Sequence, residues 1–226
     1  MNDFSFYFGL GWEHIISWAA LDHLLFIAAL AAIYSLKDWK QVLILVTAFT
    51  VGHSITLVLS AKEWMQVDSS LIEFLIPCTI AFTAITNLFQ RSFTPKAIRI
   101  NYFLALFFGL IHGLAFANLL KEIMAKDQDF AFSMFSFSVG LESGQILIVA
   151  LVLLLCELFV RMLRVDRRHW VIFLSAAVFA LSLEMAAQRR PWRTESDAGS
   201  AQTTPKNLAP TNSNFNNFFE HNRQWC

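Results

Sequence analysis

Six stretches of this sequence are long and apolar enough to cross a lipid bilayer as α-helices. They cover residues 11–36, 41–61, 71–89, 101–120, 132–163 and 170–187. A spanning helix needs about 20 mainly apolar residues, and in lipid a helix satisfies its own backbone hydrogen bonds. The chain is 56% hydrophobic and 15% charged, whereas a soluble domain is about a quarter charged. The sequence therefore predicts an all-α fold, a polytopic transmembrane helix bundle of about six spans.

The rest of the composition excludes some classes of function and marks a second region. Basic and acidic residues balance at 17 each, with no basic stripe, so we expect no nucleic-acid partner. Cys78, Cys156 and Cys226 have no CxxC spacing and predict neither a disulfide framework nor a zinc knuckle. The segment before residue 11 lacks Lys and Arg and does not resemble a signal peptide. We expect residues 1–190 to form the bundle and the polar residues 191–226 a disordered tail.

The distribution of Lys and Arg over the connecting segments predicts the orientation of the chain. The first, third and fifth connectors carry Lys37, Lys40, Arg91, Lys96, Arg99, Arg161, Arg164, Arg167 and Arg168. The second and fourth connectors carry only Lys62, Lys121 and Lys126. Because cytoplasmic loops are enriched in Lys and Arg, we expect the odd connectors in the cytoplasm and both termini outside. The cluster Arg189, Arg190 and Arg193, after the last span, favours the opposite orientation.

Several ionisable side chains lie inside the predicted spans, where a central charge costs at least about 2.5–3.5 kcal/mol. They are His14, Asp22, His23, His53, Glu73, His112 and Glu142. With a rise of about 1.5 Å per residue, all of these groups fall in the outer half of the bilayer. Asp22 and Glu142 would lie roughly 15–18 Å deep and His53 and His112 roughly 12 Å deep. His14 and Glu73 would lie near the outer mouth, so the sequence predicts one shared polar site.

Small and polar neighbours favour an inward orientation for these groups. Thr50 and Thr56 share the helical face of His53, and Ser138 and Gln145 share that of Glu142. Two Gly-xxx-Gly pairs next to the ionisable residues allow helices to approach closely, Gly109 with Gly113 and Gly140 with Gly144. We expect other polar residues to be structural: Thr83, Thr86 and Asn87 as helix contacts, and Glu157 as a partner of Arg161.

Imidazole and carboxylate ligands together suit nickel, cobalt, zinc and copper ions. The leading interpretation is a permease in which a divalent cation enters past His14 and Glu73. His23, His53 and His112, with Asp22 or Glu142, would then bind the ion. A zinc-dependent intramembrane hydrolase that uses Asp22 or Glu142 as general base is an alternative, although the chain contains no HExxH motif. A third interpretation is a structural or assembly subunit whose polar groups only hold the helices together.

Six stretches, in order between residues 9 and 149, resemble the HupE/UreJ family of bacterial membrane proteins. They are Gly11-Trp12-Glu13-His14-Ile15, Asp22-His23-Leu24-Leu25-Phe26, Phe49-Thr50-Val51-Gly52-His53-Ser54-Ile55-Thr56-Leu57, Glu73-Phe74-Leu75-Ile76-Pro77, Phe108-Gly109-Leu110-Ile111-His112-Gly113-Leu114-Ala115-Phe116-Ala117 and Gly140-Leu141-Glu142-Ser143-Gly144-Gln145. The resemblance implies an inner-membrane nickel or cobalt permease, with metalloenzyme maturation proteins for hydrogenase or urease as partners. The family's motif positions fall on His14, Asp22, His23, His53, His112 and Glu142.

The sequence departs from the family pattern in two places. Residues 15–21 separate His14 from the Asp22-His23 pair, which is two residues more than the family commonly has. At this spacing a regular helix would place His14 and His23 about 180° apart. Either the start of the first span is not a regular helix, or the two histidines belong to different sites. The second departure is Ser138, where the family pattern leads us to expect Asn.

Overall fold

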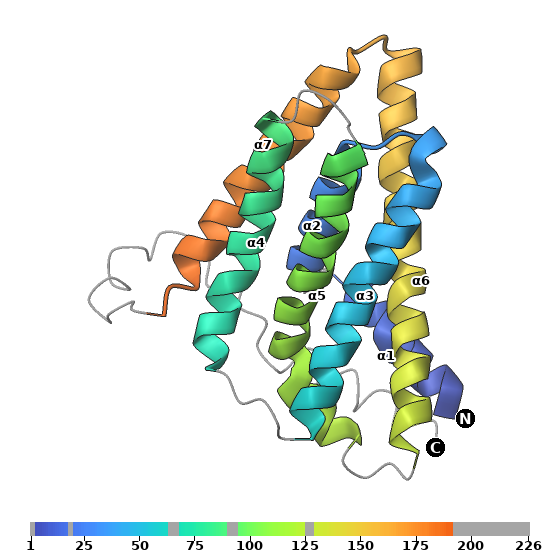
Figure 1. Cartoon of the computed structure of the whole chain (residues 1–226), viewed down its shortest axis with the longest axis vertical. Helices are drawn as coiled ribbons and strands as arrows, with labels where there is room; N and C mark the ends of the chain where they lie inside the picture. Colours follow the sequence, from blue (N-terminus) through green and yellow to red (C-terminus); the bar gives the residue numbers. More distant parts are fainter. Residues whose placement is uncertain (1–2, 18–19, 63–67, 90–94, 125–128, 192–226) are drawn as a thin grey trace. The chain divides into compact units, whose positions relative to one another are not determined.

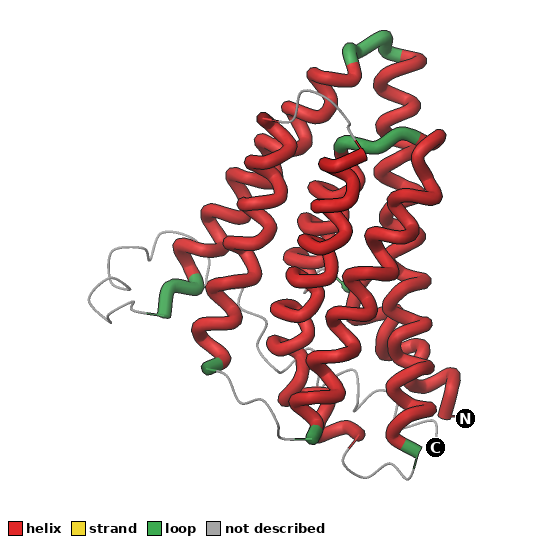
Figure 2. Tube along the Cα trace, in the orientation of Figure 1, coloured by secondary structure: helices red, strands yellow, loops and turns green. Residues whose placement is uncertain are grey.

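The computed structural model describes residues 3–17, 20–62, 68–89, 95–124 and 129–191, and every regular element within them is a helix (Figure 2). The helices are α1 (Asp3–Ile16), α2 (Leu21–Ala32), α3 (Trp39–Ala61), α4 (Ser69–Phe89), α5 (Pro95–Met124), α6 (Phe130–Glu157) and α7 (Arg167–Gln188). A short 3₁₀ turn, η2 (Leu36–Asp38), precedes α3, and α6 continues into a π-helical turn, η3 (Leu158–Met162). The predicted all-α fold is confirmed.

The described helices agree roughly with the six predicted spans. Four of them, α3, α4, α6 and α7, are long and apolar enough to cross a membrane. The helices α1 and α2 together make a fifth candidate, bent by 72° at the break between them. The apolar stretch of α5, Asn101–Phe116, is shorter than these candidate spans. The prediction of one continuous helix over residues 11–36 is wrong, because the chain is already helical at Asp3 and breaks after Ile16.

Three helix pairs and one central helix make up the bundle (Figure 1). The closest pairs are α3 with α5, α1 with α6, and α4 with α7, while α2 contacts α4, α6 and α7. Glycines allow the first two pairs to touch through their backbones. A Cβ atom at Gly11 or Gly140 would overlap a carbonyl oxygen across the α1–α6 contact, and one at Gly52 or Gly109 would do so across the α3–α5 contact. The close approach predicted for these motifs is confirmed.

Large apolar side chains line both the interior and the outer surface of the bundle, as lipid contact requires. Phe26, Phe49 and Phe137 are fully buried, whereas Phe103 and Phe173 are 68% and 73% exposed on the outside. Such a surface does not depend on water for its stability, because lipid tails solvate apolar side chains. The polar side chains are found in the interior instead, including His23, His53 and His112.

The first and fifth connectors lie at the same end of the bundle (Figure 1). Arg167, at the start of α7, donates a hydrogen bond to the carbonyl of Ile33 at 2.7 Å and pairs with Asp38 at 3.6 Å. At the end of α6, Glu157 forms the expected ion pair with Arg161, four residues further along the chain. Of the predicted tail, residues 192–226 lie outside the described part of the chain.

Candidate metal centre

Four histidines from four different helices meet in the interior of the bundle. His14 comes from α1, His23 from α2, His53 from α3 and His112 from α5. The ring centroid of His23 lies 4.8 Å from that of His14, 6.0 Å from that of His53 and 5.4 Å from that of His112. The centroids of His14 and His53 are 5.9 Å apart. We call these four side chains the histidine cluster.

The break between α1 and α2 brings His14 and His23 together. On one regular helix their side chains would point in opposite directions, but the 72° bend lets the two short helices present them to each other. The start of the first span is helical, contrary to the first of the two alternatives, and the departure from a regular helix lies at the break after Ile16. His14 lies near the end of α1 and His23 near the start of α2, so both rings flank the break.

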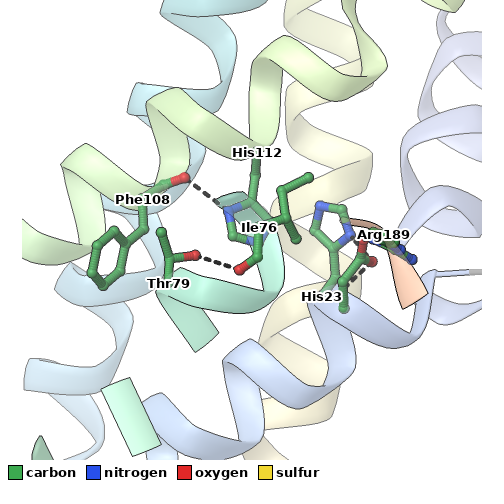
Figure 3. A network of polar contacts seen from close by, with 7 residues as sticks. His23, Ile76, Thr79, Phe108, His112 and Arg189 are labelled. Carbon is green, nitrogen blue, oxygen red and sulfur yellow. Dashed lines mark hydrogen bonds and ion pairs between the residues drawn. The ribbon is translucent and has the colours of Figure 1, made fainter. Parts of the chain in front are cut away.

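Hydrogen bonds at Nδ1 fix the orientation of two of the four rings (Figure 3). His23 Nδ1 donates to Asp22 Oδ1 at 3.1 Å, and His112 Nδ1 donates to the carbonyl oxygen of Phe108 at 2.8 Å. A carboxylate and a carbonyl only accept, so the hydrogen of each neutral ring is on Nδ1 and the lone pair on Nε2. This is the arrangement by which proteins orient histidine ligands toward a metal ion.

Five further ring nitrogens of the cluster are buried without a hydrogen-bond partner among the described residues. They are Nε2 of His14, His23 and His112 and both nitrogens of His53. Buried polar atoms in native proteins nearly always have a partner, and each exception calls for an explanation. These five nitrogens are the atoms of the cluster that could contact a ligand which the protein chain itself does not supply.

The spacing of the four rings suits one shared ion, although their ring nitrogens do not point toward a common centre. A metal–nitrogen distance of about 2 Å fits between imidazole rings whose centroids are about 5–6 Å apart. As the side chains stand, no three His, Cys, Asp or Glu groups in the described residues surround a common point at metal-binding spacing. The rings are tilted by 52–70° to one another. Rotation of the rings would therefore have to accompany binding.

Asp22 connects the cluster to the last helix of the bundle. Its Oδ1 accepts both the backbone N–H and the Nδ1–H of His23, and its Oδ2 pairs with Arg189 at 3.5 Å. Both carboxylate oxygens are thus engaged, and Asp22 orients His23 rather than facing the open nitrogens. No sequence pattern marks Arg189 as a site residue, because it lies at the end of α7, far from Asp22 in the chain.

Two predicted site carboxylates lie apart from the hydrogen bonds of the cluster. Glu142, half-buried on α6, accepts a hydrogen bond at 2.5 Å from Thr47, whose side chain is exposed on α3. Among the described residues we find no hydrogen bond or ion pair between Glu142 and a histidine. Glu73 is exposed on the first turns of α4. The structure therefore gathers Asp22 with the four histidines, but neither of these two glutamates.

The predicted supporting residues form a polar contact between α3 and α6. Thr50 donates to Gln145 Oε1 at 2.9 Å, and Ser54 bonds with Ser138 at 2.8 Å. The Nε2 of Gln145 is buried without a partner in the described residues. Thr56 donates to the carbonyl groups of its own helix. Thr50 and Ser54 thus join α3, which carries His53, to α6.

An aromatic layer, defined here as Phe26, Phe49 and Phe108, closes one side of the cluster. The rings of Phe26 and Phe49 are 4.8 Å apart, and each lies 5.1–5.4 Å from the ring of His112. The ring of Phe108 lies 6.1 Å from that of Phe26. All three are buried. On another side, the ring of Phe116 lies 4.0 Å from that of His14.

Comparison with known proteins gives one match. Residues 1–189 match the family model described as HupE / UreJ protein. No curated protein and no solved structure matches the chain. The matched region contains every described helix and all the residues of the histidine cluster.

Proposed function

The chain belongs to the HupE/UreJ family, a family of transporter type, and on this premise we propose that it is a permease for a divalent transition-metal cation. Nickel or cobalt is the proposed substrate, and the bacterial inner membrane the proposed location. The observation that carries the proposal is that four helices bring together four imidazole rings with buried, unpartnered nitrogens. The family gives the class of protein, and the histidine cluster gives the ligand chemistry.

His14, His23, His53 and His112 would bind the cation, and Asp22 would orient His23. Imidazole suits nickel, cobalt, zinc and copper. Neutral ligands also suit transport, because an ion must bind well enough to enter and weakly enough to leave. Asp22 supplies one negative charge beside the cluster, and Arg189 offsets it. The bound ion would therefore keep most of its charge uncompensated, which favours release.

The geometry gives less support to the hydrolase alternative. A zinc-dependent hydrolase needs a general base that faces the metal-bound water. Both oxygens of Asp22 are engaged by His23 and Arg189, and the carboxylate of Glu142 is bonded to Thr47. Neither group is positioned to accept a proton at the cluster.

Metal analysis of the purified protein tests the proposal. We expect protein isolated from medium containing nickel to retain the ion, and the double variant His53→Ala/His112→Ala to retain on the order of 100-fold less. Loss of two ligands should cost at least as much as loss of an orienting partner, which costs about 10–100-fold in affinity. His169→Ala is the matched control, because His169 is exposed at the start of α7.

Two results would overturn the proposal. One is equal retention of nickel and cobalt by the native protein and the double variant, when circular dichroism shows that both proteins are folded. The other is retention without uptake, in which proteoliposomes of native protein accumulate no more nickel or cobalt than protein-free vesicles.

A further inference from the structure

A small cavity with both polar and apolar lining lies between α2, α4 and α5, separate from the histidine cluster. Its volume is about 20 Å³, which is room for a single water-sized occupant. Its polar lining consists of Thr83, Thr86 and Asn87 from α4 and Asn101 from α5. Two helices thus contribute polar groups to a cavity of a membrane bundle, where unused polar groups are costly.

The polar groups that line this cavity are mainly hydrogen-bond acceptors. The hydroxyls of Thr83 and Thr86 donate to carbonyl groups of their own helix, at 2.9 and 2.8 Å. The amide of Asn87 donates to the carbonyl of Ala29 at 2.7 Å, and that of Asn101 donates to the Tyr34 hydroxyl at 3.4 Å. What these side chains retain for the cavity is chiefly oxygen lone pairs. Uncharged oxygen atoms are weak ligands for a divalent cation.

Phe108 joins the cavity to the histidine cluster. Its ring lines the cavity, while its carbonyl oxygen accepts the hydrogen bond from His112 one helical turn away. The aromatic layer of Phe26, Phe49 and Phe108 therefore stands between the two sites. One turn of helix corresponds to about 5.4 Å, so an ion leaving the cluster past Phe108 would next meet these oxygens.

Further polar groups continue from the cavity toward the end of the bundle where α3 and α7 begin. The Tyr34 hydroxyl contacts Asn101, which lines the cavity. Beyond it, Asp38 accepts hydrogen bonds from Ser35 and pairs with Arg167. The Lys and Arg residues of the first and fifth connectors predict that this end faces the cytoplasm.

We infer that this cavity is a second, transient binding site for the divalent cation, on the inward side of the histidine cluster, and that the aromatic layer separates the two sites. The inference rests on the proposed function and adds a route of release to it. Imidazole nitrogens bind the ion first, and neutral oxygens bind it more weakly afterwards. A weak second site lowers the cost of leaving the first without trapping the ion.

A pair of substitutions at Thr83 tests the inference while leaving the histidine cluster intact. Thr83→Val keeps the shape of the side chain and removes its oxygen, whereas Thr83→Ser keeps the hydroxyl. We expect Thr83→Val to retain as much nickel as native protein in detergent but to take it up into proteoliposomes on the order of tenfold more slowly. Thr83→Ser should transport within about twofold of the native rate.

A substitution at Asn101 gives a readout that a merely structural role would not produce. Asn101→Asp has nearly the same shape, and the Tyr34 hydroxyl can donate to the new carboxylate. A negative charge in the cavity should trap the passing ion, because added carboxylates raise the affinity of an oxygen site. We expect slower uptake together with up to about one further nickel ion retained per chain.

The outcomes separate this inference from the proposed function. Retention of nickel by native protein, with native uptake rates in Thr83→Val and no additional ion in Asn101→Asp, would overturn the inference and leave the permease intact. Equal loss of uptake in Thr83→Val and Thr83→Ser would also overturn it, because the hydroxyl would then not matter. Absence of nickel from native protein would instead overturn the proposed function, on which the inference depends.

Discussion

At the scale of single residues, the ion pair between Asp22 and Arg189 explains how one carboxylate can lie beside four imidazoles without becoming a ligand. Arg189 holds Oδ2 while His23 occupies Oδ1. A carboxylate bonded on both oxygens keeps a fixed orientation, and it passes that orientation to His23. Arg189 is therefore a positioning residue of the proposed metal site.

Substitution of Arg189 tests this role. We expect Arg189→Gln to weaken nickel retention by about tenfold, the lower end of the cost of losing an orienting partner. Arg189→Lys should restore retention, because the pair uses one nitrogen at 3.5 Å and needs only a positive charge there. The matched control is Arg190→Gln, since Arg190 is exposed and, in the described residues, bonds only to the carbonyl of Ala187. Retention at the native level in Arg189→Gln would contradict this role.

At the scale of helices, the α1–α6 and α3–α5 contacts are built on the same spacing. In each pair, a glycine of one helix packs against the backbone of the second helix. A glycine of the second helix packs against the residue that lies three positions before the first glycine. Gly11 and Gly140 pack against Phe137 and Phe8, and Gly52 and Gly109 pack against Leu106 and Phe49 in the corresponding way. Both helices of each pair run in the same direction. Three of the four clustered histidines thus lie on these two tightly joined pairs, His14 on the first and His53 and His112 on the second, while His23 lies on α2.

Alanine substitutions in α1 measure how much this packing contributes. A Cβ atom at Gly11 would overlap the backbone of α6, whereas one at Gly9 meets nothing within 4 Å. We expect Gly11→Ala to destabilise the protein by about 1–3 kcal/mol, the usual cost of overpacking, and Gly9→Ala to have no such effect. Unfolding in detergent, followed by circular dichroism, compares the two variants. Equal stability of both would show that α1 does not pack closely on α6.

At the scale of the whole molecule, two of the charged connectors lie at one end of the bundle (Figure 1). Asp38 and Arg167 pair across the first and fifth connectors, so the two connectors richest in Lys and Arg that the structure describes lie on one side. An excess of positive charge on one side marks the cytoplasmic face.

Reporter fusions test the orientation that follows. Alkaline phosphatase, which is active only outside the cytoplasm, should be active when fused after Pro191, and green fluorescent protein at the same position should not fluoresce. Insertion of each reporter between Leu163 and Asp166, in the fifth connector, should give the reverse pattern. A fluorescent C-terminal fusion would contradict the proposed topology. It would favour the opposite orientation, which the positive charges of Arg189 and Arg190 indicate.

Sequence patterns alone predict the membrane bundle, close helix approach at Gly109 and Gly140, and a set of ionisable side chains inside the spans that includes Glu142. These predictions depend on local properties: the length of apolar segments, residue spacing within one helix, and the cost of polar groups in lipid. Which of the ionisable side chains meet became visible only in the folded chain. The break after Ile16 has no Gly or Pro to mark it, and it turned His14 toward His23. Glu142 shares a predicted depth with the cluster, but the rotation of α6 about its axis directs it to Thr47 instead. Helix rotation and the pairing of Arg189 with Asp22 depend on packing between distant segments, which no local pattern encodes.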